Sequence, residues 1–159
     1  MRYLFSLVVV VLLISCSSKN AATSNQLPEI KETNFKGEWN LSSIQFDGFR
    51  EYSATLLGDQ NDKCFRNSTW KFVSNNNRGA YTITDGSCVA KQENFIWNYT
   101  PETNKVMIKP TGENYKSQTG DGYTFLLGGI DANSMTLTQT LTIDGGPVVM
   151  TMNFFKQNQ

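Results

Sequence analysis

The sequence predicts an all-β domain of eight short antiparallel strands that close into a small up-and-down barrel. Three observations support this fold class. Segments rich in Trp, Phe, Tyr, Val, Ile and Thr recur about every ten residues, Gly, Asn, Asp or Pro stand between them, and helical periodicity is nearly absent. Strands joined by hairpins favour closure, because a barrel has no exposed sheet edges. A two-sheet β-sandwich is the alternative.

The chain begins with one positive charge, Arg2, followed by the apolar run 7–14 and the small residue Ser15. This order is typical of a secretory signal peptide. The run is shorter than the roughly 20 apolar residues that a membrane-spanning helix needs. Residues 1–15 are therefore predicted to be a signal peptide that is removed.

The segment Leu-Ile-Ser-Cys at 13–16 resembles the lipobox of bacterial lipoproteins. The resemblance implies that Cys16 becomes the N-terminus and carries a diacylglycerol and a further acyl chain such as palmitate, which anchor it in a membrane. We expect a protein of the bacterial cell envelope, in the outer membrane and facing the periplasm, since no acidic cluster follows Cys16 closely. A secreted protein with an incidental cysteine is the alternative.

The residues after this cysteine divide into a tether and one domain. Residues 16–34 are rich in Ser, Asn, Ala, Thr and Gln and show no apolar period, which is typical of a flexible tether. Roughly 125 residues follow, enough for one domain with a real core and too few for two. We place the barrel domain at residues 35–157.

The strand pattern is clearest near the C-terminus. The predicted strands are 37–46, 64–73, 79–84, 93–100, 105–109, 122–130, 135–143 and 148–155. In strand 135–143 every second residue is threonine and the others are mostly apolar, so one face is buried and the other exposed. The segment Asp-Gly-Gly at 144–146 predicts a tight hairpin. The long connection 47–63 is predicted to form a short helix or a lid across one end of the barrel.

Composition excludes several classes of protein. The full chain has 14 basic and 14 acidic residues with no basic block, so nucleic acid is not an expected partner. It has no histidine, which excludes histidine-based triads and histidine-ligated metal sites. No nucleophile elbow, phosphate-binding glycine loop or placed pair of carboxylates is recognisable. We expect no enzyme activity, no catalytic residue, no metal site and no cofactor.

Two cysteines, Cys64 and Cys88, remain once Cys16 is assigned to the lipid. An even number of cysteines in an oxidising compartment favours a disulfide. They lie about equally far from the turn at 74–79, so a regular hairpin would place them nearly opposite one another. A redox-active pair is the alternative, although such pairs usually have closer spacing.

The segment Gly-Glu-Trp at 37–39 matches the Gly-x-Trp signature that opens the first strand of lipocalins. Together with the paired cysteines and Trp-Lys-Phe at 70–72, it resembles the lipocalin-like lipoproteins common in Bacteroidetes-type bacteria. The resemblance implies an eight-stranded barrel in which Gly37 begins the first strand and Trp39 closes the floor. Lipocalins usually stack an arginine from the last strand over that tryptophan, and here only Lys156 is available.

Two functional hypotheses follow, because small eight-stranded barrels either fill their interior with side chains or hold one small ligand. In the first, the barrel binds a small apolar or amphipathic molecule at its open end, and Gln139, on the apolar face of its strand, orients the ligand or bonds the backbone. The candidate ligand-binding residues are Trp97, Tyr99, Tyr123, Phe125, Leu137, Gln139 and Leu141. In the second, these residues form a filled core and the loops contact an envelope protein.

Overall fold

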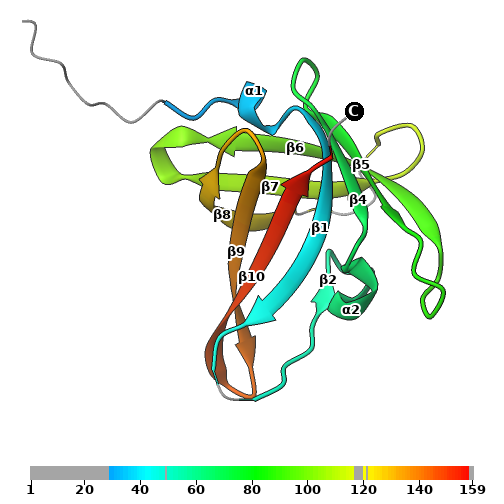
Figure 1. Cartoon of the computed structure of the whole chain (residues 1–159), viewed down its shortest axis with the longest axis vertical. Coiled ribbons are helices and arrows are strands. Elements are labelled where there is room, and N and C mark those ends of the chain that lie inside the picture. The colour runs from blue at the N-terminus through cyan, green and yellow to red at the C-terminus, as the bar shows by residue number, and fades with distance from the viewer. Residues whose placement is uncertain (1–28, 49, 117–119, 121, 158–159) are drawn as a thin grey trace, which may run out of the picture.

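The eight longer strands form one closed antiparallel barrel in the computed structural model (Figure 1), with the strand order β1-β10-β9-β8-β7-β6-β5-β4. The structure describes residues 29–157 apart from 49, 117–119 and 121. Neighbours in sequence pair in space, and β10 returns to β1 to close the barrel. The predicted up-and-down barrel is confirmed, and the β-sandwich is excluded. The predicted signal peptide and Cys16 lie outside the described residues.

The barrel strands are β1 Gly37–Phe46, β4 Thr69–Val73, β5 Arg78–Ile83, β6 Lys91–Thr100, β7 Lys105–Thr111, β8 Tyr123–Ile130, β9 Ser134–Ile143 and β10 Gly146–Lys156. The shorter elements are α1 Glu32–Phe35, β2 Thr55–Leu56, β3 Gln60–Asn61, α2 Asp62–Phe65 and a 3-10 turn at Pro101–Thr103. No helix in the described ranges has both the length and the apolar character needed to cross a membrane.

One strand boundary differs clearly from the prediction. The strand expected at 64–73 begins only at Thr69, because residues 62–65 form the helix α2 instead. Asn67, between helix and strand, has a φ of 63°, which is outside the extended region of backbone conformation. Residues 62–65 therefore form a short helix that buries Phe65, rather than extending the ladder.

The alternation predicted for β9 is confirmed. Met135 and Leu137 are buried, whereas the threonines between and after them lie on the outer face. Asp144 and Gly145 form the two-residue hairpin to β10, both with positive φ, of 52° and 80°. Two positive φ angles in succession match the right-handed twist of the strands, so this turn fixes the register of the last two strands.

Aromatic rings fill the interior of the barrel. All three tryptophans are buried, and the Trp70 ring lies 5.1 Å from that of Tyr81 and 5.7 Å from that of Phe95, measured between centroids. Phe154 meets the same ring edge-on at 5.6 Å. Rings at these spacings pack as a solid core.

One end of the barrel, which we call the closed end, is covered by α1. The indole Nε1–H of Trp39 donates a 2.7 Å hydrogen bond to the Phe35 carbonyl. The Phe35 ring lies 5.2 Å from that of Trp97 and 5.3 Å from that of Tyr99. Residues 32–34, assigned to the tether from the sequence, are thus helical and lead directly into this plug.

The opposite end, which we call the open end, is crossed by the connection between β1 and β4. Leu56 and Leu57 of this connection are buried against the barrel, which confirms the predicted lid. The disulfide Cys64–Cys88 is also confirmed, with Cα atoms 5.7 Å apart. It does not join opposite residues of a hairpin, since Cys64 lies in α2 and Cys88 in the connection from β5 to β6. The disulfide therefore fastens the lid to the barrel rim.

Candidate functional site

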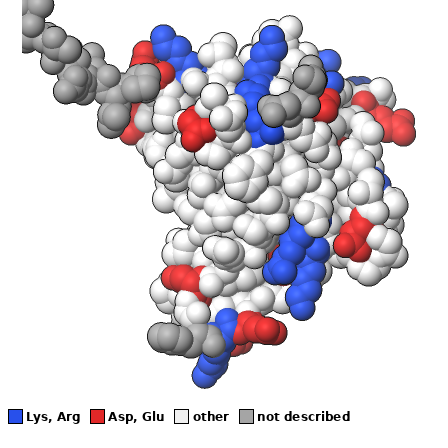
Figure 2. Space-filling model, in the orientation of Figure 1, with Lys and Arg blue, Asp and Glu red and all other residues white. Residues whose placement is uncertain are grey.

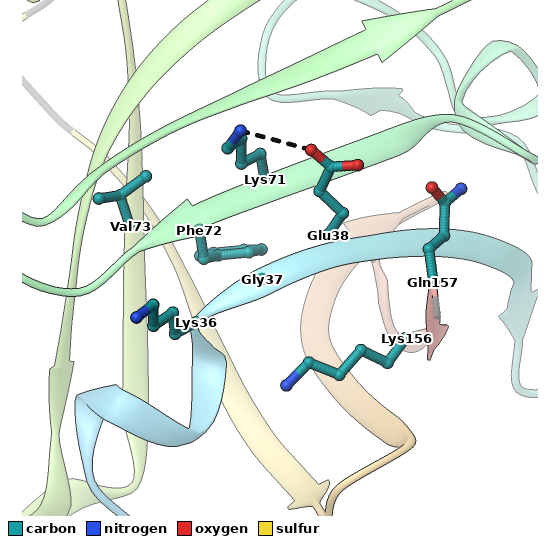
Figure 3. A pocket seen from close by; sticks show the side chains of 8 residues that line it. All are labelled: Lys36, Gly37, Glu38, Lys71, Phe72, Val73, Lys156 and Gln157. Carbon is teal, nitrogen blue, oxygen red and sulfur yellow. Dashed lines mark ion pairs between the residues drawn. The ribbon is translucent and has the colours of Figure 1, made fainter. Parts of the chain in front are cut away.

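A groove of about 750 Å³ lies at the closed end, where β1 meets β4 and β10 (Figure 3). We call it the closed-end groove. Its lining residues are Lys36, Gly37, Glu38, Lys71, Phe72, Val73, Lys156 and Gln157. Its volume is within the range of about 300–1,000 Å³ that is typical of small-molecule sites.

The strand register explains why residues so far apart in sequence meet here. Near its start β1 has a partner on each side, with Gly37 opposite Phe72 on β4 and Trp39 opposite Lys156 on β10. The backbone N–H of Gln157 donates to the Glu38 carbonyl at 2.9 Å, which extends the β10 side of the groove beyond the strand. The rigid barrel wall thus sets the positions of the lining residues.

Lys156 crosses the start of β1 to reach the tryptophan that closes the barrel floor. Its ammonium nitrogen lies 4.8 Å from the centroid of the Trp39 ring. Glycine is favoured at position 37 by its φ of 127°, and a Cβ there would also lie 2.9 Å from Cε of Lys156, so the side chain would have to shift. The lysine named from the sequence as the available cation therefore occupies the expected place over Trp39.

The groove combines positive charge with apolar surface. The Lys71 ammonium pairs with the Glu38 carboxylate at 3.4 Å, an exposed ion pair that Figure 3 marks with a dashed line. Lys36 and Lys156 have no carboxylate partner within the described part of the chain. The apolar surface comes from the half-buried Val73 and from the methylene stems of the lysines, since the Phe72 ring packs in the barrel core.

Three ammonium groups against one carboxylate, beside apolar surface, suit a molecule that is both anionic and partly hydrocarbon. Metal binding has no comparable support, because no three cysteine or acidic side chains converge within the described ranges. The groove can hold and orient a ligand, but it presents no nucleophile with an adjacent base.

The ligand-binding residues expected from the sequence lie elsewhere. Trp97, Phe125 and Leu137 are buried in the filled core, and Tyr99 is nearly so, with its hydroxyl donating to the Asn104 side chain at 3.0 Å. The three half-buried residues, toward the open end of the barrel, are Tyr123, Gln139 and Leu141. None of the seven lines the closed-end groove.

Most of the residues that line the closed-end groove were not predicted from the sequence. The three lysines of the groove, Lys36, Lys71 and Lys156, are far apart in the chain. Considered singly, each has the pattern of an ordinary surface lysine. Only the pairing of β1 with both β4 and β10 brings them together. The one available signal was the expectation that a cation covers Trp39, which points to Lys156.

Among known proteins, similarity was found to solved structures and not to any family model or curated sequence. A lipocalin-like protein from Bacteroides uniformis is 11% identical, with a TM-score of 0.48, over 78% of this chain and 99% of that one. A protein from Bacteroides eggerthii is 14% identical, with a TM-score of 0.47, over 77% and 99%.

Bovine odorant-binding protein, in a complex with a selenium-containing odorant, is 12% identical, with a TM-score of 0.43, over 84% of this chain and 77% of that one. Lipocalin-like proteins, the group that the sequence resembles, are thus among the similar solved structures. The fold assignment itself rests on the closed eight-stranded topology.

Proposed function

We propose that this protein is a binding module for a small amphipathic anion, held in the closed-end groove. The observation that carries the proposal is that Lys36, Lys71 and Lys156 line one groove of about 750 Å³ together with the half-buried Val73. An acyl chain would lie along Val73 and the lysine stems, and its acidic head group would contact Lys36 and Lys156. Binding, rather than catalysis, is the role that these groups support.

The proposed ligand position differs from the open end expected from the sequence. The buried rings of Trp70, Tyr81 and Phe95 occupy the interior below the lid, so an apolar ligand there would have to displace packed side chains. The closed-end groove needs no such rearrangement. An anionic amphiphile can therefore bind at a cost limited to ordering the lysine side chains.

We further propose that Cys16 is lipidated and holds the protein in the cell envelope, facing the periplasm. The described chain enters the barrel at the closed end, through α1 (Figure 1). A short tether from a lipid on Cys16 would therefore keep the groove near the membrane, where amphiphiles are concentrated. Metabolic labelling with an alkyne palmitate should mark the wild-type chain, and Cys16→Ser should abolish the label and release the protein from membranes.

The binding proposal is tested by titrating the Cys16→Ser chain with dodecanoate and with dodecanol, which has the same chain and no charge. We expect saturable quenching of tryptophan fluorescence by dodecanoate and binding at least about tenfold weaker for dodecanol. Lys36→Gln and Lys156→Gln should each weaken dodecanoate binding about fivefold to tenfold. Lys105→Gln, an exposed lysine at the closed end outside the groove, is the matched control and should change nothing. Equal binding of both probes, or equal effects of all three variants, would contradict the proposal.

A second function, contact with an envelope protein, is favoured by one specific surface. Figure 2 shows a broad band without charged side chains across the middle of one face, with Lys, Arg, Asp and Glu gathered toward its two ends. The outer face of β9 supplies threonines, and the neighbouring strands expose Leu126 and Phe155, at 48% and 57%. A photo-crosslinking amino acid at Thr138 tests this function, since a reproducible adduct in living cells would favour it.

A further inference from the structure

A second cavity, of about 170 Å³, lies at the open end beneath the lid. We call it the mouth pocket. It is lined by Leu57, Gly58, Asp59, Tyr81, Lys91, Glu93, Pro110 and Thr111. These residues come from the lid and from β5, β6 and β7, so the pocket shares no wall with the closed-end groove.

Charged side chains occupy interior positions of a barrel strand here. Along β6 the side chains of Phe95, Trp97 and Tyr99 face the core, and the two-residue period places Lys91 and Glu93 on the same face. Charged groups at inward positions are costly unless they are paired. Their presence at the mouth marks a place where the barrel changes from a packed core to a polar site.

The charges are paired with one another and with the lid. The Lys91 ammonium lies 3.0 Å from Oδ2 of Asp59 and 3.1 Å from Oε2 of Glu93. The Tyr81 hydroxyl donates to the same Oδ2 of Asp59 at 2.7 Å. Burial raises the pKa of Tyr81, and the hydrogen bond to Asp59 raises it further. The network fixes the two carboxylates around the pocket and leaves it with an excess of one negative charge.

The described contacts engage only one oxygen of each carboxylate. Oδ1 of Asp59 and Oε1 of Glu93 have no hydrogen-bond donor among the described residues. Both oxygens can only accept at neutral pH. A ligand that fits this pocket must therefore donate hydrogen bonds, and a positive charge would neutralise the excess.

An independent observation also points to a ligand. The side chain of Thr111 lines the pocket and is 1% exposed, yet its hydroxyl has no hydrogen-bond partner among the described residues. Buried hydroxyls in native proteins are nearly always paired, so an unpaired one calls for a specific explanation. A small molecule with its own hydroxyl or amine beside Thr111 would supply the missing partner.

From these groups we infer that the mouth pocket binds a small organic ammonium ion, through the carboxylates of Asp59 and Glu93 and the hydroxyl of Thr111. The volume equals that of about six water molecules at about 30 Å³ each, which limits the ligand to a few non-hydrogen atoms. The mouth pocket is separate from the closed-end groove of the proposed function. It carries the opposite charge, is lined by different residues and lies at the other end of the barrel.

The test is an NMR titration of the full Cys16→Ser chain with ethanolamine, which carries both an ammonium group and a hydroxyl. We expect saturable shifts of the Asp59, Glu93 and Thr111 amide signals, with a Kd of roughly 1 mM or tighter. Ethylene glycol replaces the ammonium group with a second hydroxyl at nearly the same size, and it should bind at least about tenfold more weakly.

Two variants and a control separate binding from a purely structural network. Glu93→Gln should weaken ethanolamine binding about tenfold, and Thr111→Val about threefold, since it removes the hydroxyl and keeps the shape. Glu102→Gln, in the exposed 3-10 turn at the closed end, should leave the affinity unchanged. Absence of saturable shifts, equal binding of ethylene glycol, or an unchanged affinity in Thr111→Val would overturn the inference.

Discussion

The ammonium nitrogen of Lys156 lies 4.8 Å from the centroid of the Trp39 ring, so the last strand supplies a cation over the tryptophan that closes the barrel floor. Trp39 is fully buried, and its indole nitrogen is already bonded to the Phe35 carbonyl. Lys156 therefore has two roles, because it covers the floor of the barrel and lines the closed-end groove.

Replacing Lys156 with alanine should lower the free energy of unfolding by about 1 kcal/mol, through loss of the cation–π contact and of stem packing. Urea unfolding measures the change. Lys156→Arg should retain most of the stability, since a guanidinium also stacks on an indole face. Lys105→Ala is the control on the same end of the barrel. An unchanged midpoint in Lys156→Ala would show that the contact contributes nothing.

Phe35→Ala should destabilise the fold by about 3 kcal/mol, because the ring is fully buried against Phe72, Trp97 and Tyr99 and its removal leaves a cavity. Guanidinium unfolding monitored by tryptophan fluorescence is the measurement. Thr33→Ala, on the surface of the same short helix, should have little effect. If Phe35→Ala were as stable as wild type, α1 would not be part of the folded domain.

Removal of the disulfide, by the double substitution Cys64→Ala and Cys88→Ala, should lower the free energy of unfolding by about 3 kcal/mol. The bridge closes a loop with a sequence separation of 24 residues and restricts the unfolded chain. Hydrogen exchange should quicken most in the lid, where Gln60 and Val89 are joined by two hydrogen bonds. A reducing agent should destabilise wild type and leave the double variant unchanged. Uniform quickening over the whole barrel would contradict a local role of the bridge.

Gly58→Ala should cost about 2 kcal/mol of stability. Gly58 has a φ of 66°, and a Cβ there would collide with the Tyr123 hydroxyl. Adding Tyr123→Phe removes that oxygen and should recover part of the loss, and a double-mutant cycle measures the coupling. Strictly additive effects would show that the lid and Tyr123 do not touch.

Stability should fall at alkaline pH because two groups in the mouth pocket have raised pKa values. Burial raises the pKa of Tyr81 above 10.0. Burial lowers the pKa of Lys91, but its hydrogen bonds to the carboxylates of Asp59 and Glu93 outweigh this and raise it above 10.5. Both groups therefore hold protons in the folded state at pH values where the unfolded chain releases them.

Their contribution to stability is fully present below about pH 10 and is lost as pH rises through the folded pKa values. Urea unfolding between neutral and strongly alkaline pH checks this. Tyr81→Phe should make the alkaline decline shallower, whereas Tyr115→Phe, outside the pocket, should not. An equal decline in wild type and Tyr81→Phe would exclude Tyr81 as a source of the effect.

The sequence predicts the parts of this structure that depend on local pattern. The alternation in β9 and the positive-φ pair Asp144 and Gly145 are both encoded in a few adjacent residues, and both are confirmed. The disulfide followed from the even number of cysteines left after Cys16, together with the export that the predicted signal peptide implies, and it is confirmed. The fold of residues 62–68 did not follow, because Phe65 is apolar in either a strand or a helix and only packing against Trp70 and Tyr81 decides.

Most of the closed-end groove could not be predicted from the sequence. The apolar alternation of Trp97, Phe125 and Leu137 is the same for a filled core and for a ligand cavity, so pattern alone could not distinguish them. The groove depends on register between strands that are distant in sequence, which brings Lys71 and Lys156 to opposite sides of β1. Pairing at that range is set by closure of the whole barrel.

The measurement that tests the binding account most directly is native mass spectrometry of the Cys16→Ser chain, purified without detergent from the cells that produce it naturally and then extracted with organic solvent. The account predicts a reproducible bound mass, released by the solvent as an anionic amphiphile and lost from the Lys36→Gln, Lys156→Gln double variant. A chain that carries no bound mass while remaining folded, or a bound molecule that the double variant retains, would contradict it.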